Sequence, residues 1–246
     1  MISVCLATYN GARYLREQVK SILSQLDLGD EVVISDDNSS DTTRAVVAEL
    51  NDKRIRFITN AKERRGFKNN FENALRNAKG DFIFLSDQDD VWVSDKVEVV
   101  MNLLGKFDLV VSDAAICDEN LQTKEVSLYE EINSGRGIIK NIVKSTYYGC
   151  CMAFKRNVLD TALPFPNTTV IGHDLWLGLV AETVGSVIFS EKQLVQYRRH
   201  EHTFTKTGTG YKSRRNLLVK VLDRIIMLGY YLSFLFSRRY KKGIIR

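Results

Sequence analysis

The sequence has few cysteines and no recognisable targeting signal. Its 246 residues include two prolines and four cysteines, Cys5, Cys117, Cys150 and Cys151, none of them in a CxxC spacing of the zinc-binding kind. Adjacent Cys150 and Cys151 are poor disulfide partners, so we expect four reduced thiols in a cytosolic protein. The N-terminus lacks a basic segment followed by an apolar segment and a cleavage site, which predicts no signal peptide and argues against secretion.

The C-terminal tail lacks an uninterrupted apolar run long enough to cross a membrane. Residues 217–236 are apolar but contain Lys220, Asp223 and Arg224, which leaves residues 225–236. This is shorter than the ~20 residues that a spanning helix needs. Aromatic residues inside the tail and basic residues on both sides predict an amphipathic helix on an anionic membrane surface. The alternatives are a helix packed on its own domain or on a second copy of the chain in a homodimer.

Length and composition indicate an ordered protein with a substantial core. A 246-residue chain that is 44 % hydrophobic is long enough for one large domain, or one domain with a small appendage. The formal net charge of +5 is modest, and the basic residues are concentrated in the last fifth of the chain. The basic end is therefore a local feature, and we expect no nucleic-acid partner.

The first half alternates between predicted strands and predicted helices. Apolar runs predict strands at residues 2–7, 31–35, 54–59, 82–85 and 109–112, and helical spacing of apolar residues predicts the helices between them. This alternation predicts a doubly wound, mainly parallel α/β sheet with helices on both faces. Ligands bind such sheets at the carboxyl ends of the strands. The loops expected there are ATYNG, SDDNSSD, TNAKERRGF, SDQDDVW and SDAAICDEN.

The stretch FLSDQDDVW places Asp87, Asp89 and Asp90 directly after a buried strand. Carboxylates this close repel one another and raise one another's pKa. A solvated loop at the start of a helix is one interpretation, because a helix N-terminus favours negative charge. However, Asp95 is better placed to cap the following helix. We therefore favour a divalent cation, Mn²⁺ or Mg²⁺, held by these carboxylates together with the oxygens of a bound diphosphate.

Four motifs in order, SVCLATYNG, VVISDDNSSDTT, FLSDQDDVW and GHDLWL, resemble the family 2 glycosyltransferases, which have the GT-A fold. The resemblance covers roughly residues 2–203, and FLSDQDDVW is similar to bacterial rhamnosyltransferases and related polysaccharide enzymes. It implies a nucleotide-sugar-binding half at residues 1–112 and an acceptor-binding and catalytic half of the same domain at residues 113–210. The basic amphipathic helical tail then occupies residues 211–246.

The resemblance also implies which residues bind the nucleotide. Ala7, Thr8 and Tyr9 match the end of the family's first strand, which lies against the nucleoside. Asp37 matches an aspartate that accepts a hydrogen bond from the N3–H of uracil or thymine, with Asp36 as its neighbour in the site. A carboxylate suits an imide N–H and rejects cytosine, which lacks that donor. An Asx turn at Asp37 is the structural alternative.

Phosphate and metal contacts are implied by three further segments. Asp89 matches the direct metal ligand, and Asp87 matches the acid that contacts the ribose or a metal-bound water. His200 matches a histidine that approaches the metal or the diphosphate, with one of the two arginines before it as a phosphate contact. Lys68 is placed to contact the nucleotide or its phosphates, although a solvated lysine on the first turn of a helix is the alternative.

Catalytic and acceptor-binding residues are implied by the second half. Asp174 matches the family's catalytic base, and Gly149 and Cys150 match positions near the acceptor. His173 stands where the family usually has Glu or Asp, so it is either an acceptor ligand or a capping side chain. One base and one in-line displacement would invert the anomeric centre.

Together these features predict a metal-dependent, inverting glycosyltransferase on the inner face of the cytoplasmic membrane. We expect it to move a sugar from dTDP-rhamnose or a UDP-hexose to a lipid-linked glycan, in O-antigen or capsule synthesis. Two alternatives stay open. FIFLSDQDDV also fits an aspartate-nucleophile phosphatase, with Asp87 as nucleophile and Asp89 as acid and base, although no later lysine and acidic pair is evident. A nucleotide-sugar binder without catalysis is the other.

Overall fold

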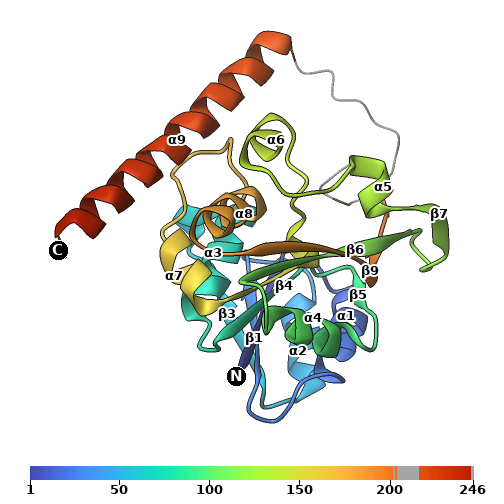
Figure 1. Cartoon of the computed structure of the whole chain (residues 1–246). Helices are drawn as coiled ribbons and strands as arrows, with labels where there is room; N and C mark the ends of the chain where they lie inside the picture. The colour runs from blue at the N-terminus through green and yellow to red at the C-terminus, as the bar shows by residue number, and fades with distance from the viewer. Residues whose placement is uncertain (202, 204–215, 245–246) are drawn as a thin grey trace.

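The computed structural model describes residues 1–201, 203 and 216–244 of the chain (Figure 1). The predicted boundary at residue 211, with the basic residues Arg214 and Arg215, lies outside the described residues, as does most of the segment that follows Thr203.

Over the described residues, a single sheet of nine strands organises the molecule. The strand order is β3-β2-β1-β4-β8-β6-β9-β5, and β7 pairs with β6 beside this path. The strands are β1 (Ile2–Thr8), β2 (Glu31–Asp36), β3 (Ile55–Thr59), β4 (Phe82–Ser86), β5 (Val91–Trp92), β6 (Leu109–Cys117), β7 (Thr123–Ser127), β8 (Met152–Lys155) and β9 (Val187–Arg198).

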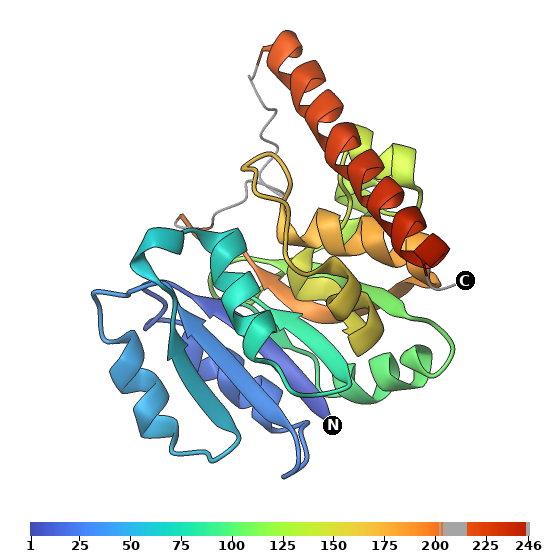
Figure 2. The same ribbon diagram turned by 90° about the vertical axis from the view of Figure 1, so that its left-hand side faces the viewer.

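Strands β3, β2, β1 and β4 are mutually parallel, and β8 pairs antiparallel with both β4 and β6. Strands β1, β2 and β4 are buried almost throughout, as their continuous apolar runs predict for parallel strands covered on both faces. The predicted mainly parallel α/β sheet with helices on both faces is confirmed (Figures 1 and 2).

Helices pack around this sheet. They are α1 (Leu15–Leu23), α2 (Thr43–Leu50), α3 (Phe67–Asn77), α4 (Lys96–Leu104), α5 (Leu128–Ile132), α6 (Ile138–Val143), α7 (Arg156–Ala162), α8 (His173–Val184) and α9 (Leu217–Ile244), with 3₁₀ turns at Lys62–Arg64 and Gly149–Cys151. Helices α1 and α2 cover one face of the parallel half and α3 the other, where α8 continues the layer (Figures 1 and 2).

Two local predictions are corrected by the structure. The expected loop SDAAICDEN belongs largely to β6, which continues to Cys117 because its register against β9 shifts around Asp113 and keeps Ala114 and Ile116 buried. Asp95 is the first flanking residue of α4, as predicted, but its side chain makes no capping hydrogen bond. The four cysteines are free and buried, which agrees with the prediction of reduced thiols.

Strand register brings three polar loops together at one edge of the sheet. Thr8 at the end of β1 pairs with Asp36 at the end of β2, and Leu6 pairs with Ser86 at the end of β4. The backbone N–H of Asp37 donates to the carbonyl oxygen of Thr8 at 2.9 Å. The loops that follow β1 and β2 therefore begin at the same height, and the loop after β4 begins two residues earlier at the same edge.

The C-terminal helix α9 lies along the outside of the domain, next to α6 and α8 (Figure 1). It forms one continuous helix of 28 residues. Across the described ranges of the chain, no helix combines the length and apolar composition that a membrane span requires.

Gly178 on α8 sets how closely that helix approaches the buried Tyr147. A Cβ atom at position 178 would lie 2.4 Å from ring carbons of Tyr147, which the packed core cannot move aside without strain. We expect Gly178→Ala to lower the free energy of unfolding by about 1–3 kcal/mol, measured by urea denaturation.

Gly229→Ala is the matched control, because a Cβ at position 229 of α9 has nothing within 4 Å. There the better helix propensity of alanine should leave stability unchanged or raise it by up to about 1 kcal/mol. Equal effects of the two substitutions would contradict the close packing at Gly178.

Candidate active site

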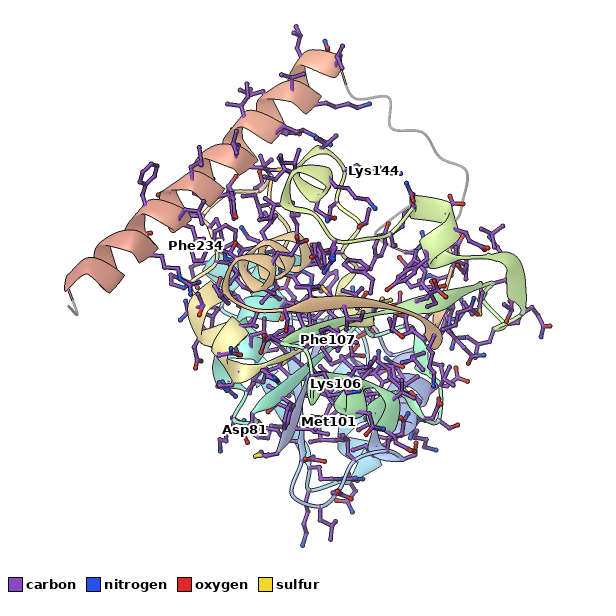
Figure 3. All side chains as sticks on the ribbon, viewed as in Figure 1. Asp81, Met101, Lys106, Phe107, Lys144 and Phe234 are labelled. Atoms are coloured by element: carbon purple, nitrogen blue, oxygen red, sulfur yellow. The ribbon has the colours of Figure 1, made fainter. Side chains whose placement is uncertain are left out.

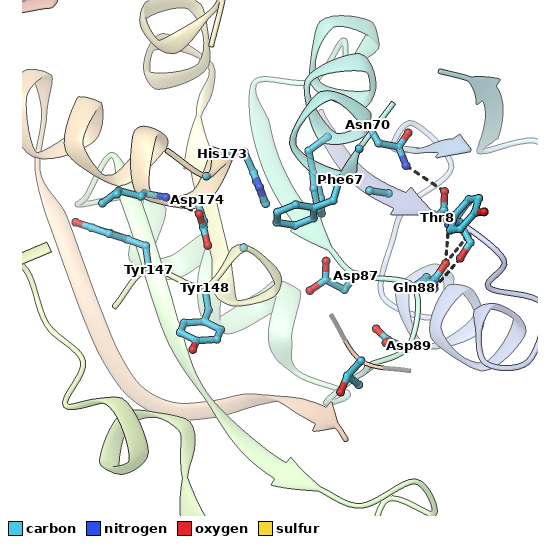
Figure 4. Close-up of a pocket in the computed structure, with 18 of the residues that line it drawn as sticks. Thr8, Phe67, Asn70, Asp87, Gln88, Asp89, Tyr147, Tyr148, His173 and Asp174 are labelled. Carbon is cyan, nitrogen blue, oxygen red and sulfur yellow. Dashed lines mark hydrogen bonds between the residues drawn. The ribbon is translucent and has the colours of Figure 1, made fainter. Parts of the chain in front are cut away.

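A pocket of about 600 Å³ opens at the carboxyl ends of β1, β2 and β4, where the topology predicts a ligand site. The predicted site residues that line it are Ala7, Thr8, Tyr9, Asp37, Asp87, Asp89, Gly149, His173 and Asp174. Figure 4 shows that Asp87, Gln88 and Asp89 of residues 87–90, which we call the acid loop, form one wall with Thr8, whereas Tyr147, Tyr148 and Asp174 form the opposite wall. The pocket thus joins residues from both halves of the chain.

The wall next to β2 is organised around the carboxylate of Asp37. Its Oδ1 accepts from the side-chain amide of Asn60 at 2.8 Å, and its Oδ2 accepts from the backbone N–H of Gly66 at 2.8 Å. Gly66 has a φ of +105°, a conformation that favours glycine. Each carboxylate oxygen has a second lone pair, so Asp37 can accept a further N–H from a ligand.

Two amide side chains that the sequence interpretation did not single out fix the end of β1. Gln88 Oε1 accepts from the hydroxyl of Thr8 at 2.7 Å and from the backbone N–H of Tyr9 at 2.9 Å. Asn70 on α3 donates to the carbonyl oxygen of Thr8 at 3.0 Å. Gln88 lies between the two acids of the Asp-x-Asp motif, so it couples the acid loop to the β1 wall (Figure 4).

The acid loop concentrates carboxyl groups on its wall of the pocket. Burial, followed by the charges of Asp89 and Asp174, raises the pKa of Asp87 to about 7. Burial, followed by the same repulsion from Asp89 and Asp87, raises the pKa of Asp90 well above its ordinary value. Asp90 is 1 % exposed, and its Oδ2 has no hydrogen-bond partner among the described residues. A buried, unpartnered carboxylate oxygen calls for a cation.

One such cation belongs to the chain itself. Lys96, the first residue of α4, is 1 % exposed, and its ammonium donates to the carbonyl oxygen of Cys150 at 2.8 Å. The ammonium also lies 4.3 Å from the ring centroid of Trp92. Burial lowers the pKa of Lys96, while the charges of Asp90 and Asp87 raise it. Lys96 therefore offsets part of the negative charge of the acid loop from beneath.

Arg198 fastens the same loop from the side. The antiparallel pairing of β5 with β9 sets Val91 opposite Gln196, and this brings Arg198, two residues further along β9, next to the acid loop. The backbone N–H of Arg198 donates to Asp90 Oδ1 at 3.1 Å, and its Nε donates to the carbonyl oxygen of Asp89 at 2.8 Å. Arg198 thus holds the loop, and because Arg198 and Arg199 both line the pocket, the phosphate contact expected from one of them stays a prediction.

The outer carboxylate, Asp89, is paired with His200. The two side chains approach at 3.0 Å between His200 Nε2 and Asp89 Oδ2, and His200 also lies against the ring of Tyr14. His200 therefore lies next to the acid matched to the metal ligand, and its own approach to the metal or the diphosphate stays a prediction. His200 does not itself line the pocket, whereas Asp89 does.

The donor set fits a hard divalent cation. Ligand atoms of Asp87, Asp90 and Cys150 lie within 4.8 Å of one another. The thiol of Cys150 is buried with a raised pKa, so it stays protonated and unsuited to Mn²⁺ or Mg²⁺. The oxygens of Asp87, Asp89 and Asp90 are the ligands these ions prefer. In the structure Asp90 therefore joins Asp87 in the group that includes Cys150, whereas Asp89, the acid matched to the direct metal ligand, is not part of it and is paired with His200.

The opposite wall carries Asp174 on the first turn of α8. Its Oδ1 accepts from the backbone N–H of Leu175 at 2.7 Å. Burial raises the pKa of Asp174 to about 6. A Cβ at position 172 would lie 2.4 Å from Asp174 Oδ1, so the glycine before the His-Asp pair leaves room for this carboxylate. Its raised pKa suits a general base that works near neutral pH.

His173 is buried within an aromatic cluster beside Asp174. Its ring stacks on Phe71 at 4.1 Å and meets the edge of Phe67 at 4.9 Å. Burial lowers the pKa of His173 to about 3, so the imidazole is neutral. Neither ring nitrogen has a hydrogen-bond partner among the described residues, and a Cβ at Gly149 would lie 2.6 Å from Nε2. Two roles were expected for His173, an acceptor ligand or a helix-capping side chain. The structure does not show the capping hydrogen bond, and the acceptor contact stays a prediction.

Three predicted site residues point elsewhere than the pocket. Lys68 donates to the carbonyl oxygens of Pro166 and Thr168, so its ammonium braces the loop before α8. Asp36 accepts from the backbone N–H of Ser39 at 2.9 Å and shapes the turn after β2. Cys150 is buried behind the acid loop. The contacts that these side chains make are structural. None of the three residues lines the pocket in which their ligand contacts were predicted.

Comparison with known proteins identifies the family. The model of glycosyl transferase family 2 matches residues 3–163. The chain is 27 % identical over 192 residues to the Escherichia coli UDP-Glc:alpha-D-GlcNAc-diphosphoundecaprenol beta-1,3-glucosyltransferase WfgD, covering 76 % of this chain and 73 % of the relative. The chain belongs to glycosyl transferase family 2, as its motifs predicted.

Solved structures agree with this fold. Residues 1–349 of S. aureus TarS in complex with UDP-GlcNAc superpose with a TM-score of 0.66 at 19 % identity, covering 86 % of this chain and 61 % of that one. Glucosyl-3-phosphoglycerate synthase from Mycobacterium tuberculosis, in complex with Mn²⁺, UDP and phosphoglyceric acid, gives a TM-score of 0.60 at 19 % identity, covering 91 % and 78 %. The predicted GT-A architecture is confirmed.

The acid loop makes stability depend on pH and on divalent cations. Because the folded-state pKa of Asp87 is raised to about 7, the folded protein holds this proton to higher pH than the unfolded chain, whose aspartates titrate near ~3.9. The free energy of unfolding should therefore fall by about 3 kcal/mol between about pH 4 and pH 7 in chelator, and Mn²⁺ should restore it near pH 7. Urea denaturation with and without Mn²⁺ measures both.

Asp87→Asn should flatten this pH dependence and weaken the stabilisation by Mn²⁺. Asp160→Asn, the same change at an exposed position of α7, is the control and should alter neither. A pH dependence that survives unchanged in Asp87→Asn would show that its cause lies outside the acid loop.

Proposed function

We propose that this family 2 glycosyltransferase is an inverting, metal-dependent enzyme that moves a sugar from a nucleoside diphosphate sugar to a hydroxyl of a lipid-linked glycan. The observation that carries the proposal is the pair of opposed walls in one pocket, with Asp87 and Asp89 on one and Asp174 on the other. The divisions proposed for the chain follow: residues 1–112 bind the donor, and residues 113–210 bind the acceptor and supply the base.

Each wall would contribute a separate part of the reaction. Asp37 would accept the N3–H of the base, and the β1 wall braced by Gln88 would hold the nucleoside. Mn²⁺ or Mg²⁺ at the acid loop would neutralise the leaving diphosphate. Asp174 would take the proton of the acceptor hydroxyl as that hydroxyl attacks the anomeric carbon. The neutral ring of His173, with both nitrogens available, would donate to or accept from a sugar hydroxyl beside Asp174.

Inversion is favoured by the count of carboxylates. Among the described residues that line the pocket, Asp174 is the one carboxylate apart from Asp37, Asp87 and Asp89. A double displacement would need a second carboxylate as nucleophile near the sugar. The family match also leaves the phosphatase alternative without support, since that alternative rested on the acid loop alone.

The relatives guide the choice of substrates. The E. coli relative is named for UDP-Glc as donor and for an undecaprenol-linked acceptor. This favours a UDP-hexose over dTDP-rhamnose for this chain, and it favours assembly of a surface polysaccharide, such as O-antigen or capsule, on a lipid carrier at the inner face of the cytoplasmic membrane.

Asp174→Asn tests the catalytic assignment. Loss of the base should lower kcat by about 10²–10⁴ while the Kd for UDP stays unchanged, because Asp174 lies on the wall away from the nucleoside. In the unsubstituted enzyme kcat should rise with pH through about 6, where Asp174 loses its proton. Release of UDP from UDP-glucose on addition of a lipid-linked GlcNAc diphosphate measures turnover, and calorimetry measures UDP binding.

Asp160→Asn is again the control and should retain full turnover. If Asp174→Asn lost less than tenfold in kcat, or if it lost UDP binding in parallel, the assignment of Asp174 as base would be wrong.

A comparison of nucleotides tests the role of Asp37 without changing the protein. UDP and dTDP carry the N3–H that its carboxylate would accept, whereas CDP lacks it. In the presence of Mn²⁺, CDP should therefore bind at least about tenfold more weakly than UDP, the loss expected for one hydrogen bond to a charged group. Thermal stabilisation measures this directly. Equal stabilisation by UDP, CDP and GDP would contradict the assignment.

A further inference from the structure

Helix α9 contacts the domain through one side. Tyr231 is buried, and its hydroxyl lies 3.0 Å from Thr183 Oγ1 on α8. Phe234 meets the indole of Trp176 edge-on at 5.5 Å between ring centroids, and Figure 3 shows Phe234 between α9 and the body. Nη2 of Arg224 donates to the carbonyl oxygen of Val143, at the end of α6, at 2.8 Å. These contacts fix which side of α9 faces outward.

The outward side is apolar along most of its length. Exposed side chains at intervals of three or four residues form a stripe, which we call the outer stripe: Leu217, Leu218, Val221, Leu222, Ile225, Leu228, Leu232 and Phe236. Leu218 is 76 % exposed, Ile225 61 % and Phe236 68 %. A helix on the surface of a protein in water turns its polar side outward, and α9 does the reverse. Such a stripe marks an interaction surface.

Charge indicates what covers the outer stripe. Helix α9 contains six basic residues and one acidic residue, so it carries five net positive charges, the same as the formal net charge of +5 of the whole chain. Two copies of α9 packed against each other would repel. An anionic membrane surface instead offers apolar acyl chains to the stripe and lipid phosphates to the basic residues.

The side of α9 that faces the domain reaches the pocket. Met227 lines it, and the hydroxyl of Tyr230 donates to the carbonyl oxygen of Asn167 at 3.0 Å. Asn167 lies in the loop before α8, whose Val170 and Gly172 also line the pocket, on the wall of Asp174. One helix therefore joins the outer stripe to the acceptor side of the pocket.

We propose that α9 lies in the interface of an anionic membrane with its outer stripe among the acyl chains, so that the acceptor side of the pocket opens next to the bilayer. The outer stripe spans about 30 Å, at ~1.5 Å per residue, which suits a helix lying flat. The position of the pocket next to the bilayer rests on the proposed function, because it gives the lipid-linked acceptor a short path from the membrane to Asp174.

Co-sedimentation of the full chain with vesicles tests the membrane part without any sugar nucleotide. The protein should bind vesicles that contain phosphatidylglycerol, bind pure phosphatidylcholine vesicles far more weakly, and dissociate as salt is added. Ile225→Glu, in the middle of the outer stripe, should lower the affinity for phosphatidylglycerol vesicles at least about tenfold, since it exchanges a buried apolar group for a charge.

Ser237→Glu is the matched control. It adds the same charge to an exposed position of α9 outside the outer stripe, so it should weaken binding only a few-fold, through charge alone. Equal losses in the two variants would contradict insertion of the stripe. Absence of vesicle binding, together with a dimer in light scattering that Ile225→Glu dissociates, would assign the stripe to a second copy of the chain instead.

A turnover assay separates this inference from the proposed function. Ile225→Glu should keep the turnover of the unsubstituted enzyme on a short-chain, water-soluble acceptor diphosphate and lose it on the same acceptor in vesicles. An enzyme that binds vesicles as expected but transfers no sugar to either acceptor would refute the proposed function. The inference that the outer stripe binds an anionic membrane would still hold. Equal turnover by the variant on both acceptors would refute the path from the bilayer.

Discussion

The charge balance beneath the acid loop is the constraint on which the site depends. Asp87 and Asp90 are held at the end of a buried strand, where their repulsion is barely screened, and the buried ammonium of Lys96 lies close to them, whereas the guanidinium of Arg198, also buried, is paired with Glu17. A single ammonium cannot neutralise two carboxylates and the neighbouring Asp89. The remaining negative charge faces the pocket, and this is what makes the loop a receptor for a divalent cation and, through it, for a diphosphate.

The acid loop and the helix that follows it are held by contacts with the second half of the chain. Lys96 reaches the carbonyl of Cys150 in the second half, and Arg198 at the end of β9 holds the backbone of Asp89 and the carboxylate of Asp90. Asp174 faces these acids from α8, whose packing on Tyr147 depends on Gly178. A shift of the second half would therefore disturb the acids as well as the base. Helix α9 extends this continuity outward, from Met227 in the pocket wall to the exposed stripe.

Much of this arrangement could be predicted from local sequence pattern. Apolar runs marked β1 to β4, and topology then placed Thr8, Asp37 and Asp87 at one edge. The predictions failed where long-range packing decides. Lys96 was not singled out from the sequence, because its burial depends on β8 running beside β4 and bringing Cys150 over it. Likewise Lys68 was expected at the phosphates, but it braces the loop at Pro166 and Thr168, a contact between residues about a hundred positions apart. Gln88 was passed over because nothing in the sequence shows that it reaches Thr8.

A divalent cation and the diphosphate of a nucleotide should meet at the acid loop. A crystal grown with Mn²⁺ and UDP, measured at a wavelength where manganese scatters anomalously, tests it most directly. We expect a manganese peak bonded to a carboxylate of the acid loop, Asp89 first, with the diphosphate of UDP on the same ion and the uracil ring at Asp37. Manganese or diphosphate bound elsewhere, with the carboxylates of Asp87, Asp89 and Asp90 untouched, would contradict it.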